Sequence, residues 1–315
     1  NHIYTGRSYK KMTPDRAGEQ LRNVEEFHNV TKYLTNNVQS DIIADLMNNL
    51  HPEERDLPNH EKKIVIVFNN GTLYVEPKLM DGTCSWKFIN EFIPGDLALF
   101  SITKDFEPWM MGEDRWKGSH WEKVMNHITS NDPKRLDLVQ KFFGSILVPS
   151  FNLQKCMLLV GTEGTGKSTI ASAVASVFES DSCTHITLEN MGDRFNVAGL
   201  TDSVVNFSQE LLSRDADSNV FKRLIAQDWM TIEKKFKDPM SVRLYTKFIF
   251  ASNAMPTFKT YDGAVRRRFL ICDIKKKVDT PIFDLAESLK RDNHLVVNFF
   301  LRGLVLLIGS RFQVG

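Results

Sequence analysis

The chain contains 315 residues, of which 42% are hydrophobic, and its formal net charge is +1. This length and apolar content allow one large domain plus a smaller one without stabilising disulfides or metals. A net charge near zero excludes an attraction of the whole molecule to nucleic acid, so such contacts must come from local patches. The four cysteines show no C-x-x-C spacing, which predicts reduced cytosolic thiols and no zinc site. The chain does not begin with Met, and we expect it to be part of a longer protein.

The first part of the chain predicts a mixed, mainly helical domain. Apolar residues follow helical spacing over 15–50, which predicts a helix there. The polar, proline-containing stretch 51–61 predicts a linker or long loop. Two apolar runs around Asn69-Asn70-Gly71 predict a β-hairpin over 64–75, because an Asn-Gly pair favours a tight hairpin turn.

A further helix is predicted between Asp132 and Pro149. Asp132 followed by Pro133 is typical of a helix start, and Pro149 is expected to end the helix. The residues that this helix is expected to bury are Leu136, Val139, Phe142, Phe143, Ile146 and Leu147.

After Pro149 the sequence alternates short apolar runs with helical patterns, which is typical of an α/β fold with a buried, mainly parallel sheet. The predicted strands are at 156–160, 203–207, 247–252 and 268–274. We therefore expect a sheet domain over 151–275, preceded by the smaller, mainly helical domain 1–150 and followed by a C-terminal helical segment, 276–315. Its apolar run at 295–308 is shorter than the roughly 20 residues that a bilayer span needs, which predicts a buried helix and no membrane partner.

The strongest chemical signal is the sequence Gly161-Thr162-Glu163-Gly164-Thr165-Gly166-Lys167-Ser168, which fits G-x-x-x-x-G-K-[ST]. It lies between an apolar strand and a helical run that begins at Thr169, which we include in the predicted nucleotide site. Glycines in this pattern let backbone N–H groups converge on phosphates, the lysine reaches the β and γ oxygens, and the serine hydroxyl binds Mg²⁺. The following helix directs its positive N-terminus at the same charge. The motif predicts a nucleotide site for ATP and Mg²⁺, although the motif alone does not separate kinases, GTPases and motors.

Two polar residues at predicted strand ends are candidates for hydrolysis. Glu210 follows the strand at 203–207, and a carboxylate there would orient the attacking water and help Ser168 to hold Mg²⁺. Gln209 stands where an Asp usually precedes such a Glu, and Glu210 could instead begin a solvated helix. Asn253 ends the strand at 247–252, where it would position the water against the γ-phosphate; a turn-forming Asn is the alternative.

Two basic clusters complete the candidate set. Arg266 or Arg267 would stabilise transition-state charge on the ATP of a neighbouring subunit, as an arginine finger does, unless the cluster is only a solvated turn. Lys234, Lys235 and Lys237 surround Phe236 and offer both phosphate neutralisation and a stacking face for single-stranded DNA. Taken alone, such a lysine run is more often a solvated loop.

The phosphate loop and the stretches "VVNFSQE", "TIEKKFKD", "FIFASN" and "AVRRRF" occur in an order that resembles the superfamily 3 helicases of the phage, plasmid and poxvirus primase–helicase family. The resemblance is detailed over 150–275 and looser over 69–150. It implies an AAA+-like ATPase core and a 1–150 segment that serves as an oligomerisation collar. Position by position, it assigns Lys167 and Ser168 to nucleotide and Mg²⁺, Glu210 to the catalytic acid and Asn253 to the sensor.

The same resemblance implies a ring, usually hexameric, that hydrolyses ATP between subunits and moves 3′ to 5′ on single-stranded DNA to unwind a forked duplex. It places the DNA-contacting hairpin at 228–243 and the finger at Arg266 or Arg267. It also implies a primase or polymerase domain upstream in the full-length chain, and a location in the cytoplasm of the infected or host cell.

An alternative function remains open on the same residues. A ring-forming replication initiator or loader would use ATP mainly to lock assembly and grip DNA, with little unwinding, and Gln209 favours this reading. A small-molecule kinase would need an acceptor pocket and a lid, and the sequence marks neither.

Overall fold

A computed structural model describes residues 2–4, 9–11, 59–93, 96, 98–209, 217–233, 239–256, 258, 262–278 and 284–314. The helix predicted over 15–50 and most of the predicted linker lie outside these residues. At the N-terminus, β1 (His2–Tyr4) and β2 (Tyr9–Lys11) form an antiparallel pair.

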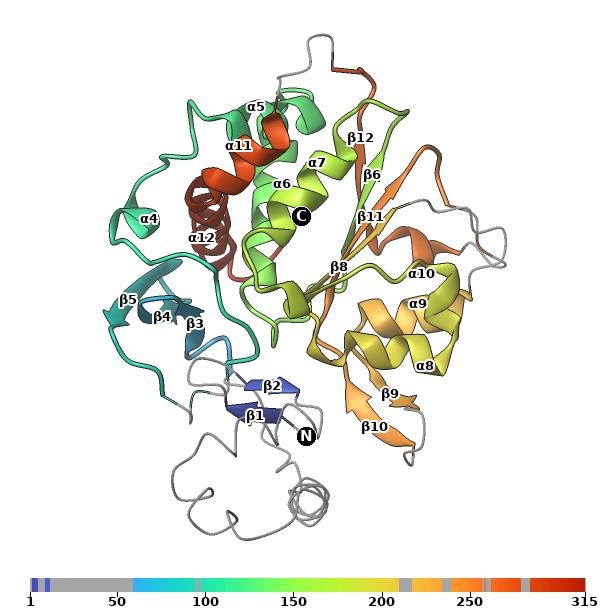
Figure 1. The fold of residues 1–315 in the computed structure, drawn as a ribbon, viewed down its shortest axis with the longest axis horizontal. Helices are drawn as coiled ribbons and strands as arrows, with labels where there is room; N and C mark the ends of the chain where they lie inside the picture. The colour runs from blue at the N-terminus through green and yellow to red at the C-terminus, as the bar shows by residue number, and fades with distance from the viewer. Residues whose placement is uncertain are drawn as a thin grey trace, which may run out of the picture.

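The centre of the molecule is a five-stranded sheet in which all neighbouring strands are parallel (Figure 1). Its strands, in the order in which they lie side by side, are β12 (Phe269–Asp273), β6 (Cys156–Val160), β11 (Lys247–Ser252), β8 (Val205–Gln209) and β7 (Cys183–Thr184). The four predicted strands are confirmed. The strand expected at 203–207 begins two residues later, because Ser203 ends the 3₁₀ helix η4 (Ala198–Asp202). Strand β7 was not predicted, since two residues are too few to show a pattern.

Alternating side chains of this sheet enter two separate cores. In β6, Met157 and Leu159 join a first core, whereas Cys156 and Leu158 join a second. This period of two is the geometry of any strand. Because both faces are covered, the strand is apolar throughout.

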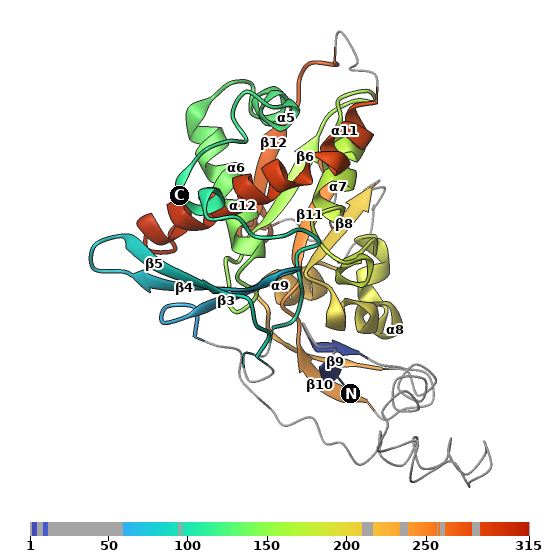
Figure 2. The same ribbon diagram turned by 60° about the vertical axis from the view of Figure 1, so that its left-hand side comes forward.

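Helices cover both faces of the sheet (Figures 1 and 2). The first core contains side chains of α6 (Pro133–Ile146), α7 (Lys167–Ala175) and α12 (Asn293–Gly309). The second contains side chains of α9 (Ser218–Ile225) and of the antiparallel pair β9 (Trp229–Ile232) and β10 (Met240–Arg243). Other helices in the described part of the chain are α4 (Trp109–Gly112), α5 (His120–Thr129), η2 (Ser180–Ser182), η3 (Glu189–Gly192), α8 (Arg194–Val197), α10 (Gly263–Arg266) and α11 (Leu285–Arg291).

The predicted hairpin near residue 70 is confirmed and belongs to a three-stranded antiparallel sheet. Its strands are β3 (Ile64–Phe68), β4 (Gly71–Lys78) and β5 (Thr83–Ile89). Side chains of β3 and β4, Ile66 and Leu73 among them, belong to the same first core as the helices on the five-stranded sheet. The backbone N–H of Ile102 bonds to the carbonyl of Val67 at 2.8 Å, which continues the sheet towards the end of α7.

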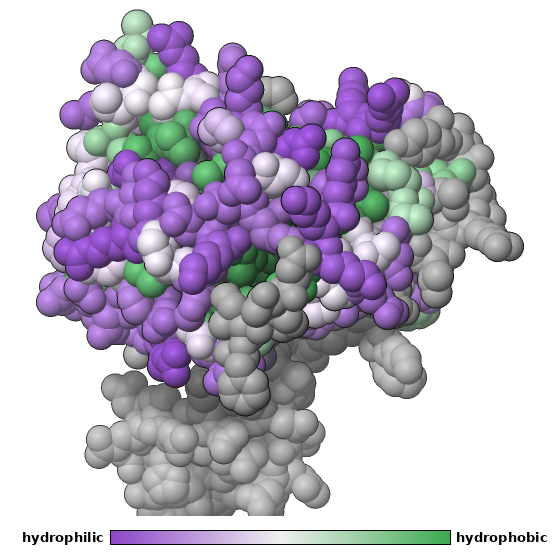
Figure 3. All heavy atoms as spheres, turned by 90° about the horizontal axis from the view of Figure 1, so that it is seen from above, coloured by the Kyte–Doolittle hydropathy of each residue, from purple (hydrophilic) through white to green (hydrophobic). Residues whose placement is uncertain are grey.

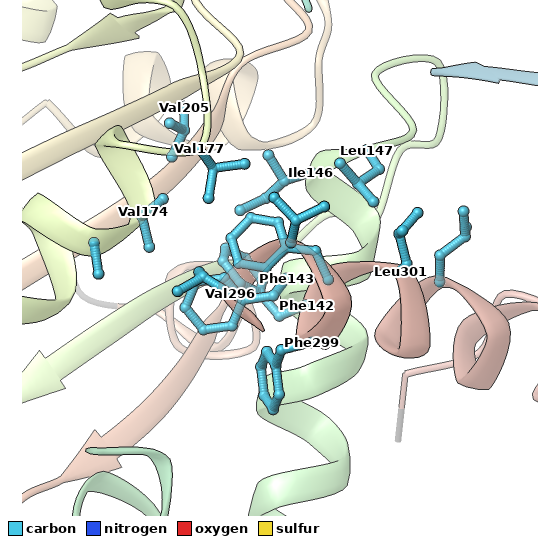
Figure 4. Close-up of a cluster of buried hydrophobic side chains, with 14 of the residues drawn as sticks. Phe142, Phe143, Ile146, Leu147, Val174, Val177, Val205, Val296, Phe299 and Leu301 are labelled. Carbon is cyan, nitrogen blue, oxygen red and sulfur yellow. The ribbon is translucent and has the colours of Figure 1, made fainter. Parts of the chain in front are cut away.

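Helix α6 confirms the second predicted helix. The Asp132 side chain accepts a hydrogen bond from the N–H of Lys134 at 2.9 Å, and Pro133 occupies the first turn, as expected for a helix start. Of the residues expected to be buried, Leu136 is only half-buried and the others are buried. Figure 4 shows Phe142, Phe143 and Phe299 in the core between α6 and α12.

The predicted C-terminal helix is also confirmed as α12, and most of its side chains are buried. Gly144 of α6 and Gly303 of α12 face each other so closely that a Cβ on Gly303 would lie 2.0 Å from the carbonyl oxygen of Gln140. No single helix among those described is long and apolar enough to cross a membrane; α11 and α12 reach that length only together, bent by 70°.

Candidate functional site

The candidate site lies at the carboxyl end of β6. From β6 the chain passes to the far edge of the sheet at β7, returns through β8 and β11, and crosses β6 to form β12. In open parallel sheets, ligands bind outside the carboxyl ends of strands where the strand order reverses. That position is occupied here by residues 161–166, the glycine-rich loop that joins β6 to α7.

Both neighbouring strands hold the glycine-rich loop in place. The N–H of Gly161 bonds to the carbonyl of Ser252, at the end of β11, at 3.0 Å. The N–H of Ile274 bonds to the carbonyl of Val160 at 2.7 Å, and the N–H of Val278 bonds to the carbonyl of Gly164 at 3.2 Å. Three strand ends therefore fix one loop.

The three glycines of the loop are needed for two different reasons. Gly164 and Gly166 have φ angles of +79° and +86°, a left-handed conformation that other residues adopt at a cost. Gly161 has an ordinary φ, but a Cβ there would lie 2.9 Å from the carbonyl oxygen of Ile274 and 2.9 Å from Oγ1 of Thr165. Gly164 and Gly166 therefore allow the loop to curve, and Gly161 leaves room for the carbonyl of Ile274 and the side chain of Thr165.

The Lys167 ammonium lies within this loop. Its Nζ donates to the carbonyl of Gly161, to the carbonyl of Thr162 at 3.0 Å, and to Oγ1 of Thr165 at 3.3 Å. Burial lowers the pKa of Lys167, and the nearby Glu163 opposes this shift. The positive charge is thus held at the mouth of the loop, beside the first turn of α7.

The amino end of α7 adds its own positive potential. Gly166 precedes the helix and provides no side-chain cap for its first N–H groups. Such N–H groups bind anions well, because they align with the helix dipole. Ser168 is exposed in the first turn, Thr169 is half-buried, and Thr162 and Glu163 are exposed in the loop. This end of the molecule can hold a polyphosphate.

Asn253 is brought into contact with the loop. It follows the last residue of β11, and its Oδ1 accepts a hydrogen bond from Nζ of Lys167 at 3.3 Å. The two residues are 86 positions apart in the sequence, and the pairing of Ser252 with Val160 places their strand ends side by side.

The candidate acid lies outside the described residues. Glu210 follows Gln209, the exposed last residue of β8, which pairs with Ala251 of β11. Strand β8 therefore ends on the same side of the sheet as the glycine-rich loop, one strand beyond β11. Among the described residues, no group of three or more His, Cys, Asp or Glu is placed to hold a metal ion. Ser168 is the described residue whose hydroxyl fits Mg²⁺, an ion that keeps most of its ligands from phosphates and water.

The arginine cluster lies at the amino ends of the sheet strands, whereas the glycine-rich loop lies at their carboxyl ends. Arg266 and Arg267 precede β12, and the first residue of β12 pairs with the first residue of β6. Strands of this length separate the two edges by roughly 13 to 16 Å. Both side chains are exposed, whereas Arg268 is buried and donates to the carbonyl of Ala264 at 2.6 Å. Arg266 and Arg267 are therefore remote from Lys167 in the same chain.

The predicted DNA-contacting stretch 228–243 contains the antiparallel pair β9–β10. Lys234, Lys235 and Lys237 lie between these strands in the sequence, outside the described residues. Met230 and Ile232 of β9 are buried in the second core, so the pair is anchored to the sheet domain.

A pocket of about 180 Å³ beside the loop was not predicted from the sequence. It is lined by Lys123, Val124, His127 and Ile128 of α5, by Thr165, Gly166 and Thr169, and by Val278 and Leu285. Mainly apolar walls with a few polar groups are typical of ligand pockets. Ser119 and Glu122 mark the start of α5 in the sequence, but they do not indicate that α5 lies against the loop.

Seen from above, the surface is mostly hydrophilic, with small separate hydrophobic areas (Figure 3).

The sequence profile of one family, described as "Family of unknown function (DUF5906)", matches residues 159–268. That range begins within β6 and ends just before β12, so it includes the glycine-rich loop, Asn253, Arg266 and Arg267. No curated protein gives a significant match.

Solved structures of the C-terminal region of NrS-1 have similar folds. The apo structure of NrS-1 C-terminal region (305–718) is 14% identical, with a TM-score of 0.52 and coverage of 76% of this chain and 68% of that chain. The A form apo structure is 16% identical, with a TM-score of 0.51 and coverage of 68% and 56%. The A form structure of region 305–718 is 15% identical, with a TM-score of 0.48 and coverage of 58% and 46%. The chain spans about half the length of these two A form structures. At such identities the two likenesses with TM-scores above 0.5 show a shared fold.

Proposed function

We propose that this chain is the ATP-driven helicase part of a viral or plasmid replication protein, of the superfamily 3 class with an AAA+-like core. In this proposal it forms a ring, hexameric in the simplest case, and translocates 3′ to 5′ on single-stranded DNA to unwind a forked duplex. A primase or polymerase domain precedes it in the full-length chain, as in a deep-sea vent phage primase–polymerase, and 1–150 serves as the collar.

The observation that carries the proposal is the hydrogen bond between Lys167 and Asn253 at the carboxyl end of β6. It joins the lysine of the glycine-rich loop to the amide of a neighbouring strand end. A triphosphate in the loop would then have its terminal phosphate beside Asn253, where a polar side chain can orient an attacking water. Ser168 would hold the Mg²⁺ that neutralises the phosphates.

The pocket against α5 supports a nucleotide rather than a bare polyphosphate. It opens beside Thr165 and Gly166, so a base bound there would be next to phosphates bound in the loop. The base would contact the apolar side chains of Val124, Ile128 and Leu285, which line the pocket.

The position of the arginines supports an assembled ring. Because Arg266 and Arg267 lie at the opposite sheet edge from Lys167, neither can complete the site of its own chain. In a head-to-tail ring, one of them would reach the ATP of the next subunit as an arginine finger. Such a residue contributes about 10³ to 10⁵ in rate.

The proposal is tested by ATP hydrolysis and by strand displacement on a forked duplex. Lys167→Ala should lower hydrolysis by about 10²- to 10³-fold, as loss of one preorganised cationic or donor group does. Glu210→Gln should abolish turnover while leaving ATP binding intact. A wild-type chain that remains monomeric with and without a non-hydrolysable ATP analogue would refute the ring, the finger and the motor together.

A second function is favoured by Gln209. This residue lies exposed at the end of β8, at the sheet edge that bears the glycine-rich loop, and an amide there supplies no negative charge for Mg²⁺. In a replication initiator or loader, ATP would drive assembly and DNA binding with slow turnover. ATP-dependent assembly without strand displacement would support this function and exclude the helicase. Lys234→Ala is the matching control for DNA binding.

A further inference from the structure

Three consecutive lysines lie beside the glycine-rich loop, directly after β12, and we call them the lysine strap: Lys275, Lys276 and Lys277. One backbone hydrogen bond on each side attaches the strap to the loop. The N–H of Ile274 bonds to the carbonyl of Val160 at 2.7 Å, and the N–H of Val278 bonds to the carbonyl of Gly164 at 3.2 Å. In Figures 1 and 2 the chain leaves β12 beside the turn that joins β6 to α7.

The charges of the lysine strap are not neutralised by the described part of the fold. All three side chains are exposed, and none of them forms an ion pair or a side-chain hydrogen bond with another described residue. Other lysines of the chain do have a carboxylate within 3.1 Å, namely Lys63, Lys117, Lys141, Lys222 and Lys290. The strap therefore presents its positive charge to solvent at the entrance of the site.

The surroundings of the strap add further positive charge. Val278, which adjoins the strap, lines the pocket of about 180 Å³ together with Lys123 of α5, and Lys167 lies within the loop. Across the loop, the pocket lining and residues 273–279, five lysines outnumber three carboxylates, which are Glu163, Asp273 and Asp279. Because the whole chain carries a formal charge of only +1, this excess is local to the site.

A concave site with charges of one sign concentrates oppositely charged ligands and raises their association rate by about 10- to 10³-fold. We propose that the lysine strap steers the phosphate tail of an incoming nucleoside triphosphate into the glycine-rich loop. The proposal rests on the proposed function, because it requires that the loop binds a triphosphate. It adds residues that lie outside the phosphate-binding motif and more than 100 positions after it in the sequence.

Steering by exposed charges depends on salt and on the charge of the ligand. The Debye length falls from about 10 Å at 0.1 M ionic strength to about 3 Å at 1 M, so the attraction should nearly vanish at high salt. The attraction also grows with each added phosphate, because the Coulomb energy is proportional to the ligand charge. The strap should therefore favour a triphosphate over a diphosphate or a monophosphate.

The test is stopped-flow association of the full chain with fluorescent mant-ATP at about 0.1 M ionic strength. A variant that combines Lys275→Gln, Lys276→Gln and Lys277→Gln should associate roughly 10-fold more slowly, at the lower end of the range for steering because Lys123 and Lys167 remain. Its dissociation rate should change little, since a charge at the rim of a site acts mainly on association. The difference in association rate should be smaller for mant-ADP and mant-AMP, and it should close at about 1 M salt.

A second triple variant provides the matched control. It combines Lys62→Gln, Lys78→Gln and Lys87→Gln, which removes the same charge from exposed lysines at the three-stranded sheet, away from the loop in Figures 1 and 2. This control should associate with mant-ATP as fast as the wild type. Both triple variants should keep the wild-type Tm, because the exchanged side chains are exposed and unpaired among the described residues.

Each outcome assigns a failure to one claim. If the wild-type chain binds mant-ATP and the strap variant associates equally fast at low salt, the strap has no role and the proposed function stands. If the wild-type chain binds no mant-ATP, both are wrong. If the control slows association as much as the strap variant does, the net charge of the chain sets the rate and steering by the strap is wrong. A change in the dissociation rate alone would replace steering by direct contact with the bound phosphates.

Discussion

The contact between α6 and α12 gives a prediction in which two physical effects have opposite signs. Gly303 lies in the interior of α12, so helix propensity alone predicts that Gly303→Ala stabilises the protein by about 0.5 to 1 kcal/mol. The structure predicts the reverse. The new Cβ would lie 2.0 Å from the carbonyl oxygen of Gln140, whereas ordinary contacts begin at 3.4 Å, so the helices must separate by 1.4 Å (3.4 − 2.0) at this point.

Because the obstructing atoms belong to the backbone, no side-chain rotation can relieve the clash. Overpacking of this kind costs about 1 to 3 kcal/mol, occasionally more, and we expect the upper end of that range. After subtraction of the propensity gain, the net loss is about 2 kcal/mol. This corresponds to a fall in Tm of roughly 3 °C for a chain of this size.

Thermal and urea unfolding of the two proteins measure this difference. Gly112→Ala is the control, because a Cβ on Gly112 meets nothing within 4 Å, and it should not lower the Tm. A Gly303→Ala protein that is as stable as the wild type, or more stable, would show that helix propensity outweighs the close approach of the two backbones.

Three further outcomes are expected. Asn253→Ala should lower kcat for ATP hydrolysis by about 10²- to 10³-fold, because it removes the group that orients water, with ATP affinity by fluorescence nearly unchanged; a parallel loss of affinity would contradict that role. One of the two variants Arg266→Ala and Arg267→Ala should lower ATP hydrolysis by about 10³-fold or more. Mixing that variant with Lys167→Ala subunits should restore part of the hydrolysis, since one subunit supplies the intact nucleotide loop and the other supplies the arginine. Absence of recovery argues against a finger that acts between subunits. Burial lowers the pKa of Lys247 to about 7, below its value of about 10.4 in the unfolded chain. Above pH 7 the unfolded chain therefore binds more protons than the folded chain. Between about pH 7 and pH 8.5, the free energy of unfolding should rise by up to about 1.4 kcal/mol per pH unit. In urea titrations across that window, Lys247→Met should flatten the rise, and an equal slope in both proteins would exclude Lys247 as its source.

Local sequence patterns predicted those elements whose signals lie within a few neighbouring residues. The Asp132-Pro133 start, together with Pro149, predicted α6, and the Asn69-Asn70-Gly71 turn predicted the hairpin of β3 and β4. The G-x-x-x-x-G-K-S spacing predicted a loop between β6 and α7. Strand β5 was missed although Thr83, Trp86, Phe88 and Ile89 are of types that favour strands. Strand β7 was missed because two residues are too few to show a pattern.

The candidate site was predictable in its parts and not in its assembly. The sequence marked Lys167 and Asn253 separately, and only strand pairing shows that their side chains meet. It marked Arg266 and Arg267 as candidates for a finger, and only the register of β12 with β6 shows that they lie at the far sheet edge. The lining of the pocket from α5 had no sequence signal, because a helix face is apolar whether it meets a core or a ligand.

The sequence by itself predicted four strands of the central sheet, the β3–β4 hairpin, α6, α12 and the glycine-rich loop, because propensity, turn chemistry and hydrophobic periodicity are local properties of the chain. The tertiary structure decided the strand order β12-β6-β11-β8-β7, the contact of Lys167 with Asn253, the position of the lysine strap beside the glycine-rich loop, and the meeting of Gly144 with Gly303. The physical reason is that backbone hydrogen bonds between strands are nearly independent of side-chain identity. Which strands become neighbours therefore depends on how the whole chain buries its two cores.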